Sequence, residues 1–355
     1  MAGMSSLVAL LLACTEYGYE AASDLDSEDS APPTPALDED GDGLTVDQDC
    51  DDKDPNSTAV ADDGDCDGRL TEHDCDDTDP TNQLPADVDD PDCDGVSTSA
   101  SGGELVLFEP GGFDVQMGCT ADVHCDEDEY PPHPVSFSRW WRIGVTEVTQ
   151  DQFELMLGYD PAKYKDCGGD CPVETVTWHM AVDYANALST AAGLPTCYDC
   201  TGEEHDVICV AKGSPYACEG YRLPTEAEWE MAAKCNENTV YPGSDTVEEV
   251  GWYEDNSGHV TQPVAQKQAN ACGVYDMSGN VKEWMNDWYA PDYFAVSPEL
   301  DPEGPADGFE WAVRGGDASY TGTGLRTSNR TKRDGGSPKH GFRVARTLHA
   351  PPPAD

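Results

Sequence analysis

Two stretches of sequence decide the fold of this chain. The first is Gly220-Tyr221-Arg222-Leu223-Pro224-Thr225-Glu226-Ala227-Glu228-Trp229-Glu230, and the second, about fifty residues further on, is Gly273-Val274-Tyr275-Asp276-Met277-Ser278-Gly279-Asn280-Val281-Lys282-Glu283-Trp284. In the first stretch, Thr225 is followed three positions later by Glu228, and this capping box predicts the start of a helix. We therefore expect a helix over residues 226–234. Two shorter segments follow in order, Arg314-Gly315-Gly316 and Gly341-Phe342-Arg343-Val344-Ala345.

Two more helices are predicted upstream. Thr149 and Gln152 form another capping box, and Gly158 is a stop signal for that helix. A second helix is expected from about Trp178 to Ala192, because apolar and aromatic residues recur at positions 181, 184, 185 and 188. We expect a hairpin over residues 110–118 and a strand over 135–143, with short strands, turns and loops elsewhere.

The charge of the chain is strongly acidic. Its 355 residues include 71 Asp and Glu against 19 Lys and Arg, for a formal charge of -52. Such a balance excludes nucleic acid as a partner, because its phosphates would be repelled, and it favours cation binding. The acidic excess is densest between Asp38 and Asp94, which indicates a dedicated segment ahead of one larger domain.

The N-terminus carries an apolar run at residues 7–13 that ends on Cys14. The run is too short to span a bilayer as a helix, but it suits the core of a signal peptide. Residues 11–14 resemble a bacterial lipobox, which predicts a signal peptide over 1–13, lipidation of Cys14 and a disordered linker over 14–37. The alternative is a hydrophobic tail with an unrelated cysteine, since residues 1–6 contain no Lys or Arg. We expect a lipid-anchored protein of the bacterial envelope, at the outer membrane or cell surface.

The cysteine content predicts an oxidising compartment. Fifteen cysteines are far more than a reduced cytosol usually supports in a chain of this length. The pairs Cys119 with Cys125, Cys167 with Cys171 and Cys209 with Cys218 could each close a small loop, although spacing leaves the connectivity open. Cys197-x-x-Cys200 could be a redox or zinc pair, but a disulfide role is favoured because no second such motif accompanies it.

An aspartate-rich repeat occupies residues 38–98. Asp40-Gly41-Asp42-Gly43 and Asp49-Cys50-Asp51-Asp52-Lys53-Asp54-Pro55 recur 25 residues later, and a partial third copy starts at Asp92. Alternating carboxylates with glycine at the tight turns suit a hard cation, and the pattern resembles the calcium repeats of thrombospondin type 3. The alternative is a solvated acidic linker that binds ions diffusely. The expected calcium ligands are Asp38, Asp40, Asp42, Asp49, Asp51, Asp52 and Asp54 in the first copy, and Asp63, Asp65, Asp67, Asp74, Asp76, Asp77 and Asp79 in the second.

The motifs quoted at the outset resemble those of the formylglycine-generating enzyme, or sulfatase-modifying factor, family. Segments 147–153, 172–178 and 263–265 also match the signatures of that family, so the resemblance extends over about 240 residues in order. It implies an irregular α+β domain related to C-type lectins over residues 103–348. It also implies a structural calcium site that uses the side chains of Asp276 and Glu283 and the backbone oxygens of Gly279 and Val281.

The resemblance fails at the position of the catalytic copper. The active enzymes bind copper(I) through two cysteines shortly after the Arg-Gly-Gly turn, whereas this chain has no cysteine after Cys272. Asp317 stands where those enzymes have a serine, and Lys282 where they have a tryptophan. We therefore expect no copper and no formylglycine-generating activity.

The sequence thus favours a binding module over an enzyme. We expect a calcium-stiffened stalk that presents a pocket for a peptide or glycan, lined by Asp276, Lys282, Trp284, Asp317, Tyr320, Arg326 and Arg330. The alternative is a divergent oxidoreductase of the family, of the formylglycine-generating or non-heme iron type, that acts on a peptide or small thiol. A third possibility is a purely structural envelope protein.

Overall fold

The computed structural model describes residues 96–99, 103–113, 115–120, 124–333 and 339–348. Cys14, the linker and the aspartate-rich repeats lie outside the described residues. The predictions made for them therefore stay predictions.

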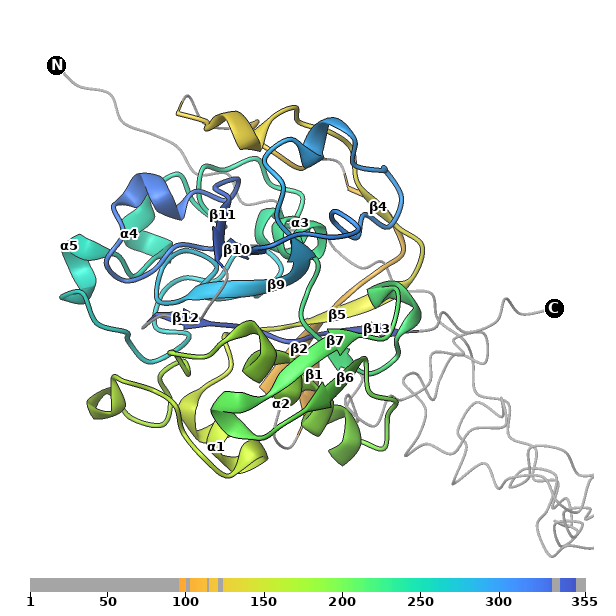
Figure 1. Ribbon diagram of the computed structural model, residues 1–355. Coiled ribbons are helices and arrows are strands. Elements are labelled where there is room, and N and C mark those ends of the chain that lie inside the picture. The colour runs from red at the N-terminus through yellow and green to blue at the C-terminus, as the bar shows by residue number, and fades with distance from the viewer. Residues whose placement is uncertain (1–95, 100–102, 114, 121–123, 334–338, 349–355) are drawn as a thin grey trace, which may run out of the picture.

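Two sheets form the centre of the domain (Figure 1). The larger sheet is antiparallel, with the order β1-β2-β5-β13-β8. Its strands are β1 (Val96–Ser99), β2 (Gly103–Phe108), β5 (Trp140–Gly144), β13 (Ala345–Leu348) and β8 (Tyr221–Arg222). The second sheet has the order β11-β10-β9-β12, with β12 parallel to β9. Its strands are β11 (Thr331–Arg333), β10 (Trp311–Arg314), β9 (Lys282–Trp288) and β12 (His340–Gly341).

The three predicted helices are confirmed. They are α1 (Gln150–Leu157), α2 (Trp178–Ala191) and α3 (Glu226–Lys234). Both predicted capping boxes form, at Thr149 with Gln152 and at Thr225 with Glu228, and Gly158 ends α1 in the left-handed conformation. Two single-turn helices follow, α4 (Val247–Val250) and α5 (Glu254–Ser257).

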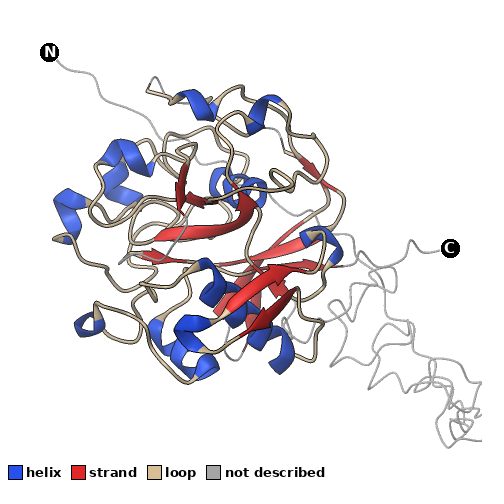
Figure 2. Cartoon of the chain, viewed as in Figure 1, coloured by secondary structure: helices blue, strands red, loops and turns tan. Residues whose placement is uncertain are grey.

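Loops and short 3-10 turns make up much of the remaining chain (Figure 2). The 3-10 turns lie at Glu127–Glu129, Lys165–Cys167, Glu204–Asp206, Pro215–Ala217, Tyr293–Ala295 and Gly322–Leu325. Two small two-stranded sheets pair β3 (Gly111–Gly112) with β4 (Ser136–Phe137) and β6 (Tyr198–Thr201) with β7 (Ile208–Ala211). The mixed α+β architecture is thus confirmed.

Two local predictions were wrong. Residues 110–118 do not form their own hairpin, because β3 pairs with β4 and Met117 pairs with His133, so that the chain runs alongside residues 133–137. The expected strand over 135–143 is divided between β4 and β5. The break lies at Ser138, because its backbone N and its Oγ both donate to the Asp301 carboxylate and not to a neighbouring strand. Long-range partners decided both outcomes.

Fully buried arginines brace the loops around the core. Arg222 donates to both carboxylate oxygens of Glu228 at 2.7 Å, so it fixes the capping box of α3 to β8. Arg314, at the end of β10, pairs with Glu226 and Glu230 on the same helix. Because burying one unpaired charge is very costly, each arginine of the sequence motifs is matched to a buried carboxylate.

Five disulfides join ten cysteines of the described residues. They link Cys119 to Cys125, Cys167 to Cys171, Cys197 to Cys218, Cys200 to Cys209, and Cys235 to Cys272. The first two are among the pairings that the spacing allowed, whereas the third possibility, Cys209 with Cys218, does not form. Cys209 lies directly opposite Cys200 in the β6–β7 ladder, a proximity that spacing along the chain does not reveal. Cys197 and Cys200 therefore belong to two separate disulfides.

Candidate functional site

The main candidate site lies between β9 and the loop that follows β10. Lys282, the first residue of β9, forms an ion pair with Asp317, and their side chains are only 4% and 5% exposed. The Lys282 ammonium lies 3.7 Å from the centre of the Tyr320 ring. Asp317 also accepts hydrogen bonds from the backbone N and Oγ of Ser319, at 2.8 and 2.6 Å. The structure thus brings together three of the seven predicted pocket residues.

The electrostatics of this site are dominated by lysines. Burial by itself would raise the pKa of Asp317, but Lys282 and the Ser319 donors outweigh it, so that the pKa lies below its ordinary value. Lys339 lies 4.0 Å from Asp317 and has no closer carboxylate among the described residues. Burial lowers the pKa of the Lys339 ammonium; Asp317 opposes this shift, while the charges of Lys282 and Lys163 add to it.

A cavity of about 370 Å³ lies between two loop segments, one at residues 163–167 and one at residues 260–263. It is lined by Lys163, Tyr164, Asp166, Cys167, Val260, Thr261, Gln262 and Pro263. One wall is tied to the site because Gln262 N donates to Asn280 Oδ1 at 2.9 Å, two residues before Lys282. The other wall is tied to it through Glu174, which accepts from Tyr164 N at 2.7 Å and whose charge acts on Lys339. Among the described residues, Lys163 is the only lysine that lines the cavity, and Lys282, Asp317 and Lys339 are not among its lining residues.

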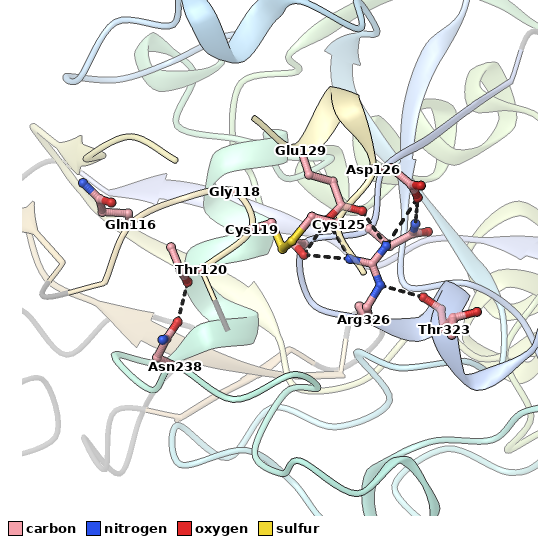
Figure 3. The surroundings of a disulfide bond; sticks show 12 residues. Gln116, Gly118, Cys119, Thr120, Cys125, Asp126, Glu129, Asn238, Thr323 and Arg326 are labelled. Atoms are coloured by element: carbon pink, nitrogen blue, oxygen red, sulfur yellow. Dashed lines mark hydrogen bonds and ion pairs between the residues drawn. A yellow bond between two sulfur atoms is a disulfide. The ribbon is translucent and has the colours of Figure 1, made fainter. Parts of the chain in front are cut away.

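Two of the predicted pocket arginines are fully engaged elsewhere. Arg326 forms a two-pronged ion pair with Glu129, both distances being 2.6 Å, and its Nε donates to Thr323 O at 2.9 Å (Figure 3). The disulfide of Cys119 and Cys125 lies beside this pair and closes the loop that leads to Glu129 (Figure 3). Arg330 forms a similar ion pair with Glu226, at 2.7 and 2.8 Å. These arginines fasten loops together.

Trp284 is also a core residue. Its side chain is fully buried, its indole N donates to Val176 O at 3.0 Å, and its ring stacks on His340. Asp276 belongs to yet another environment, next to Glu147 and Arg343. The seven predicted pocket residues therefore do not share one cavity wall; only Lys282, Asp317 and Tyr320 form a common cluster.

The predicted calcium loop is buried and carries excess negative charge. Asp276 is 2% exposed, adopts a left-handed φ of 56°, and accepts from Ala265 N at 2.6 Å through Oδ2, while Oδ1 has no hydrogen-bond partner. Burial raises the pKa of Asp276 to about 6. Burial also raises the pKa of Glu147 well above its ordinary value, and the charges of Asp276 and Glu283 add to this shift.

This loop fits calcium only in part. The Asp276 Oδ1 atom is a spare oxygen of the kind that calcium binds. Glu283, by contrast, is already neutralised by Arg343, which donates to both of its oxygens at 2.7 and 2.8 Å, and Trp229 Nε1 donates to it at 2.9 Å. The backbone oxygens of Gly279 and Val281 complete the predicted set.

A second cavity, of about 390 Å³, lies at the base of the β6–β7 hairpin. It is bordered by the Cys197–Cys218 disulfide, Tyr198, Lys212 and Asn286, and contains none of the predicted site residues. Although it is slightly larger, neither Lys282 nor Asp317, the two positions that differ from the active enzymes by resemblance, lines it. We therefore centre the functional argument on the Lys282 site.

The sequence matches the sulfatase-modifying factor enzyme 1-like domain over residues 94–348. The chain belongs to this family. The chaperone protein LppX of Paenibacillus barcinonensis is 33% identical over 273 residues, which cover 69% of this chain and 89% of that protein. The formylglycine-generating enzyme of Streptomyces coelicolor is 30% identical over 247 residues, covering 58% of this chain and 76% of the enzyme.

The fold agrees with that of a solved structure. Treponema denticola variable protein 1 superposes with a TM-score of 0.60 at 28% identity, covering 69% of this chain and 95% of that chain. The family resemblance inferred from the sequence motifs is therefore confirmed.

Some residues of this family member's site were not predicted. Lys163 and Lys339 are separated along the chain by more than the whole of α2 and α3, and neither stands in a recognisable motif. Glu147 belongs to a signature segment, but only the fold places its carboxylate near Asp276. No signal in a single sequence identifies such contacts.

Proposed function

We propose that this chain is a ligand-binding module that does not perform the copper-dependent oxidation of its enzymatic relatives. The buried ion pair of Lys282 and Asp317, covered by Tyr320, carries the proposal. By resemblance, the same two positions hold a tryptophan and a serine in the active enzymes. A salt bridge that is less than 6% exposed leaves little room for a substrate thiol at that point.

The pairing of the cysteines supports the same proposal. Copper(I) is a soft ion that requires thiolate ligands in such a site, and cysteines in disulfides cannot supply them. All ten cysteines within the described residues belong to disulfides, and no cysteine follows Cys272 in the sequence. The donor atoms near Asp317 are hydroxyl, carboxylate and ammonium groups, which do not suit copper(I).

The proposed location is the extracytoplasmic side of the bacterial envelope. Five disulfides in one domain are typical of an oxidising compartment. A lipid anchor at Cys14 would attach the protein to the membrane, with the acidic repeats as a calcium-stiffened spacer. Within the part of the chain that the structure describes, no helix has the length and apolar character needed to cross a bilayer.

The proposed ligand is a peptide or a glycan, bound at the cavity that Lys163 and Thr261 line. The similarity to a protein named as a chaperone is compatible with a peptide ligand. Calcium is the proposed bound ion, both in the aspartate-rich repeats and in the loop of Asp276. In the loop, the Asp276 Oδ1 atom, which has no hydrogen-bond partner in the described structure, supports a cation, and so does the nearby Glu147 carboxyl, whose pKa is raised by burial and by the charges of Asp276 and Glu283.

An activity assay tests the proposal directly. The full chain, loaded with copper(I) under reducing and then aerobic conditions, is incubated with a cysteine peptide converted by the Streptomyces coelicolor enzyme. We expect no mass change in the peptide, and calcium but no stoichiometric copper in elemental analysis. Conversion of the peptide with copper near one per chain would support the divergent oxidoreductase instead.

A further inference from the structure

We propose that the outer face of the β6–β7 hairpin binds an extended segment of a partner protein, in which apolar side chains are followed by Lys or Arg. This face carries Ile208 and Val210 on β7 beside Asp199 and Thr201 on β6. None of these four residues lines the cavity proposed for the ligand, so the inference goes beyond the proposed function.

The alternation of side chains along β7 turns two apolar residues outward. Cys209 is 2% exposed and forms a disulfide with Cys200, which lies opposite it in the ladder. Because successive side chains of a strand point to opposite faces, Ile208 and Val210 lie on the other face, where they are 55% and 60% exposed. The solvent face of an antiparallel sheet is ordinarily polar. Two branched aliphatic side chains there form an apolar surface that no described residue covers.

The hairpin is fixed to the domain from its inner side. It packs against α2, and besides the disulfide between its strands, a second one joins Cys197, just before β6, to Cys218 (Figure 1). On α2, Asn186 Nδ2 donates to a carbonyl of β6 at 2.9 Å, and His179 Nδ1 accepts from an amide of β7 at 3.1 Å. A partner therefore meets a face that is already in place, so that less conformational entropy is lost on binding.

The charges beside this face determine the charge of the partner. The turn between the strands contains three exposed acidic side chains that form no ion pair with the described residues, namely Glu203, Glu204 and Asp206. At the other end of the hairpin, Asp199 is paired with Lys212 at 3.6 Å. The unpaired negative charge thus lies at the Ile208 end of the apolar surface. Apolar side chains followed by basic ones complement this arrangement.

The same charges argue against the chain itself as the occupant. Two copies that met through this face would bring two acidic surfaces together, in a protein with a formal charge of -52. The first 95 residues contain only two Lys or Arg residues, Lys53 and Arg69, so their sequence is also of the wrong charge. An anionic lipid surface would be repelled in the same way. The complementary occupant is a separate protein with basic residues.

The spacing of the face defines a probe. Side chains two residues apart on an extended chain lie on the same side, so two apolar side chains can contact Ile208 and Val210 while two basic ones reach the acidic turn. The probe is acetyl-Val-Thr-Val-Thr-Lys-Thr-Lys-amide. Two matched peptides remove one part each. In acetyl-Thr-Thr-Thr-Thr-Lys-Thr-Lys-amide the apolar part is lost, and in acetyl-Val-Thr-Val-Thr-Gln-Thr-Gln-amide the charged part is lost.

The test is an NMR titration of the isotope-labelled full chain, with calcium and at physiological salt. Because NMR reports on each backbone amide, it separates binding at the hairpin from diffuse attraction of a cationic peptide to residues 38–98. The variant Ile208→Thr with Val210→Thr removes the apolar surface without a change of charge, and threonine suits a strand. The matched control, Leu155→Thr with Val296→Thr, changes two aliphatic side chains that are at least as exposed elsewhere.

We expect the probe to shift the amides of β6, β7 and their turn, and to bind about fivefold or more tightly than either matched peptide. Its affinity should fall about fivefold or more in Ile208→Thr with Val210→Thr, but by less than about twofold in the matched control. If the double variant fails to fold, the single variant Val210→Thr keeps the test decisive, with an expected loss of about twofold or more.

Three results would overturn the inference: no shift at the hairpin amides, equal binding of the probe and a matched peptide, or an equal loss in the matched control. Sedimentation velocity and flotation with phosphatidylcholine vesicles test the other occupants. Dimerisation or vesicle binding that is lost only in Ile208→Thr with Val210→Thr would also overturn it, because the occupant would then be a second copy or a lipid surface.

Discussion

The buried pair of Lys282 and Asp317 allows a quantitative prediction about stability. Both side chains are about 95% buried, so removal of one charge leaves the other uncompensated in the interior. Breaking a buried ion pair in this way typically costs about 3–5 kcal/mol. We expect Lys282→Met to cost about 3 kcal/mol, near the lower limit, because Asp317 keeps the two donors of Ser319 and the charge of Lys339.

Asp317→Asn should cost a similar amount for a different reason. The asparagine Oδ1 can still accept from Ser319, but Lys282 loses its anion and retains only the Tyr320 ring, a contact that stabilises by about 1–2 kcal/mol. Removing both charges together removes the penalty for the unpaired partner. The double variant should therefore be more stable than the sum of the single losses predicts, by about 2 kcal/mol or more.

Equilibrium unfolding in guanidinium chloride with the disulfides intact measures these differences, and thermal melting checks them. A loss of 3 kcal/mol should lower the Tm by about 6–12 °C in a domain of this size. The control is Asp199→Asn, which breaks the exposed Lys212–Asp199 pair and should change stability by less than about 1 kcal/mol. Single losses at Lys282 and Asp317 that stay below about 1 kcal/mol and add without coupling would refute the buried pair as a structural element.

Three further outcomes are expected. Burial, together with the charge of Glu226, raises the pKa of Asp287 well above its ordinary value, so the folded state loses stability as the pH rises above about 4. In thermal melts from pH 4 to 7, the Tm of Asp287→Asn should therefore rise relative to that of the wild type. Parallel curves of Tm against pH would contradict this. Replacing Cys235 and Cys272 by serine removes a disulfide that joins residues 37 positions apart, and should lower the free energy of unfolding in urea by about 4 kcal/mol. The same change at Cys200 and Cys209, which are 9 positions apart, should lower it by about 2.6 kcal/mol, because a shorter loop restricts the unfolded chain less. The reverse order would contradict this explanation. Calcium bound at the Asp276 loop should stabilise the domain by about 2.7 kcal/mol when its concentration is about 100 times its Kd. Calorimetric melting of Asp276→Asn should show no such gain. An equal gain in the wild type and in Asp276→Asn would place the calcium elsewhere.

The elements that the sequence predicted correctly depend on neighbours along the chain. The capping box of Thr225 and Glu228 joins atoms three residues apart, so that a local pattern is enough to place the start of α3. The same holds for Thr149 and for the left-handed Gly158. The small disulfide loop at Cys119 and Cys125 is likewise local. In each case the partners are close in space because they are close in sequence.

The candidate site was predictable only where the family resemblance supplied positions. Lys282 and Asp317 were named because of the residues they replace, and the structure adds that they pair with each other. The roles of Arg326 and Arg330 could not be predicted, because their partners Glu129 and Glu226 are distant in sequence and many other carboxylates were equally available.

The sequence by itself determined the family, the three helices and the absence of a cysteine after Cys272, and its cysteine content predicted an oxidising compartment. Only the tertiary structure decided which cysteines pair, which carboxylate each buried arginine contacts, and that Lys282 and Lys339 both lie beside Asp317. The physical reason is that local hydrogen bonds and residue types are written along the chain, whereas the matching of buried charges depends on which distant segments pack together.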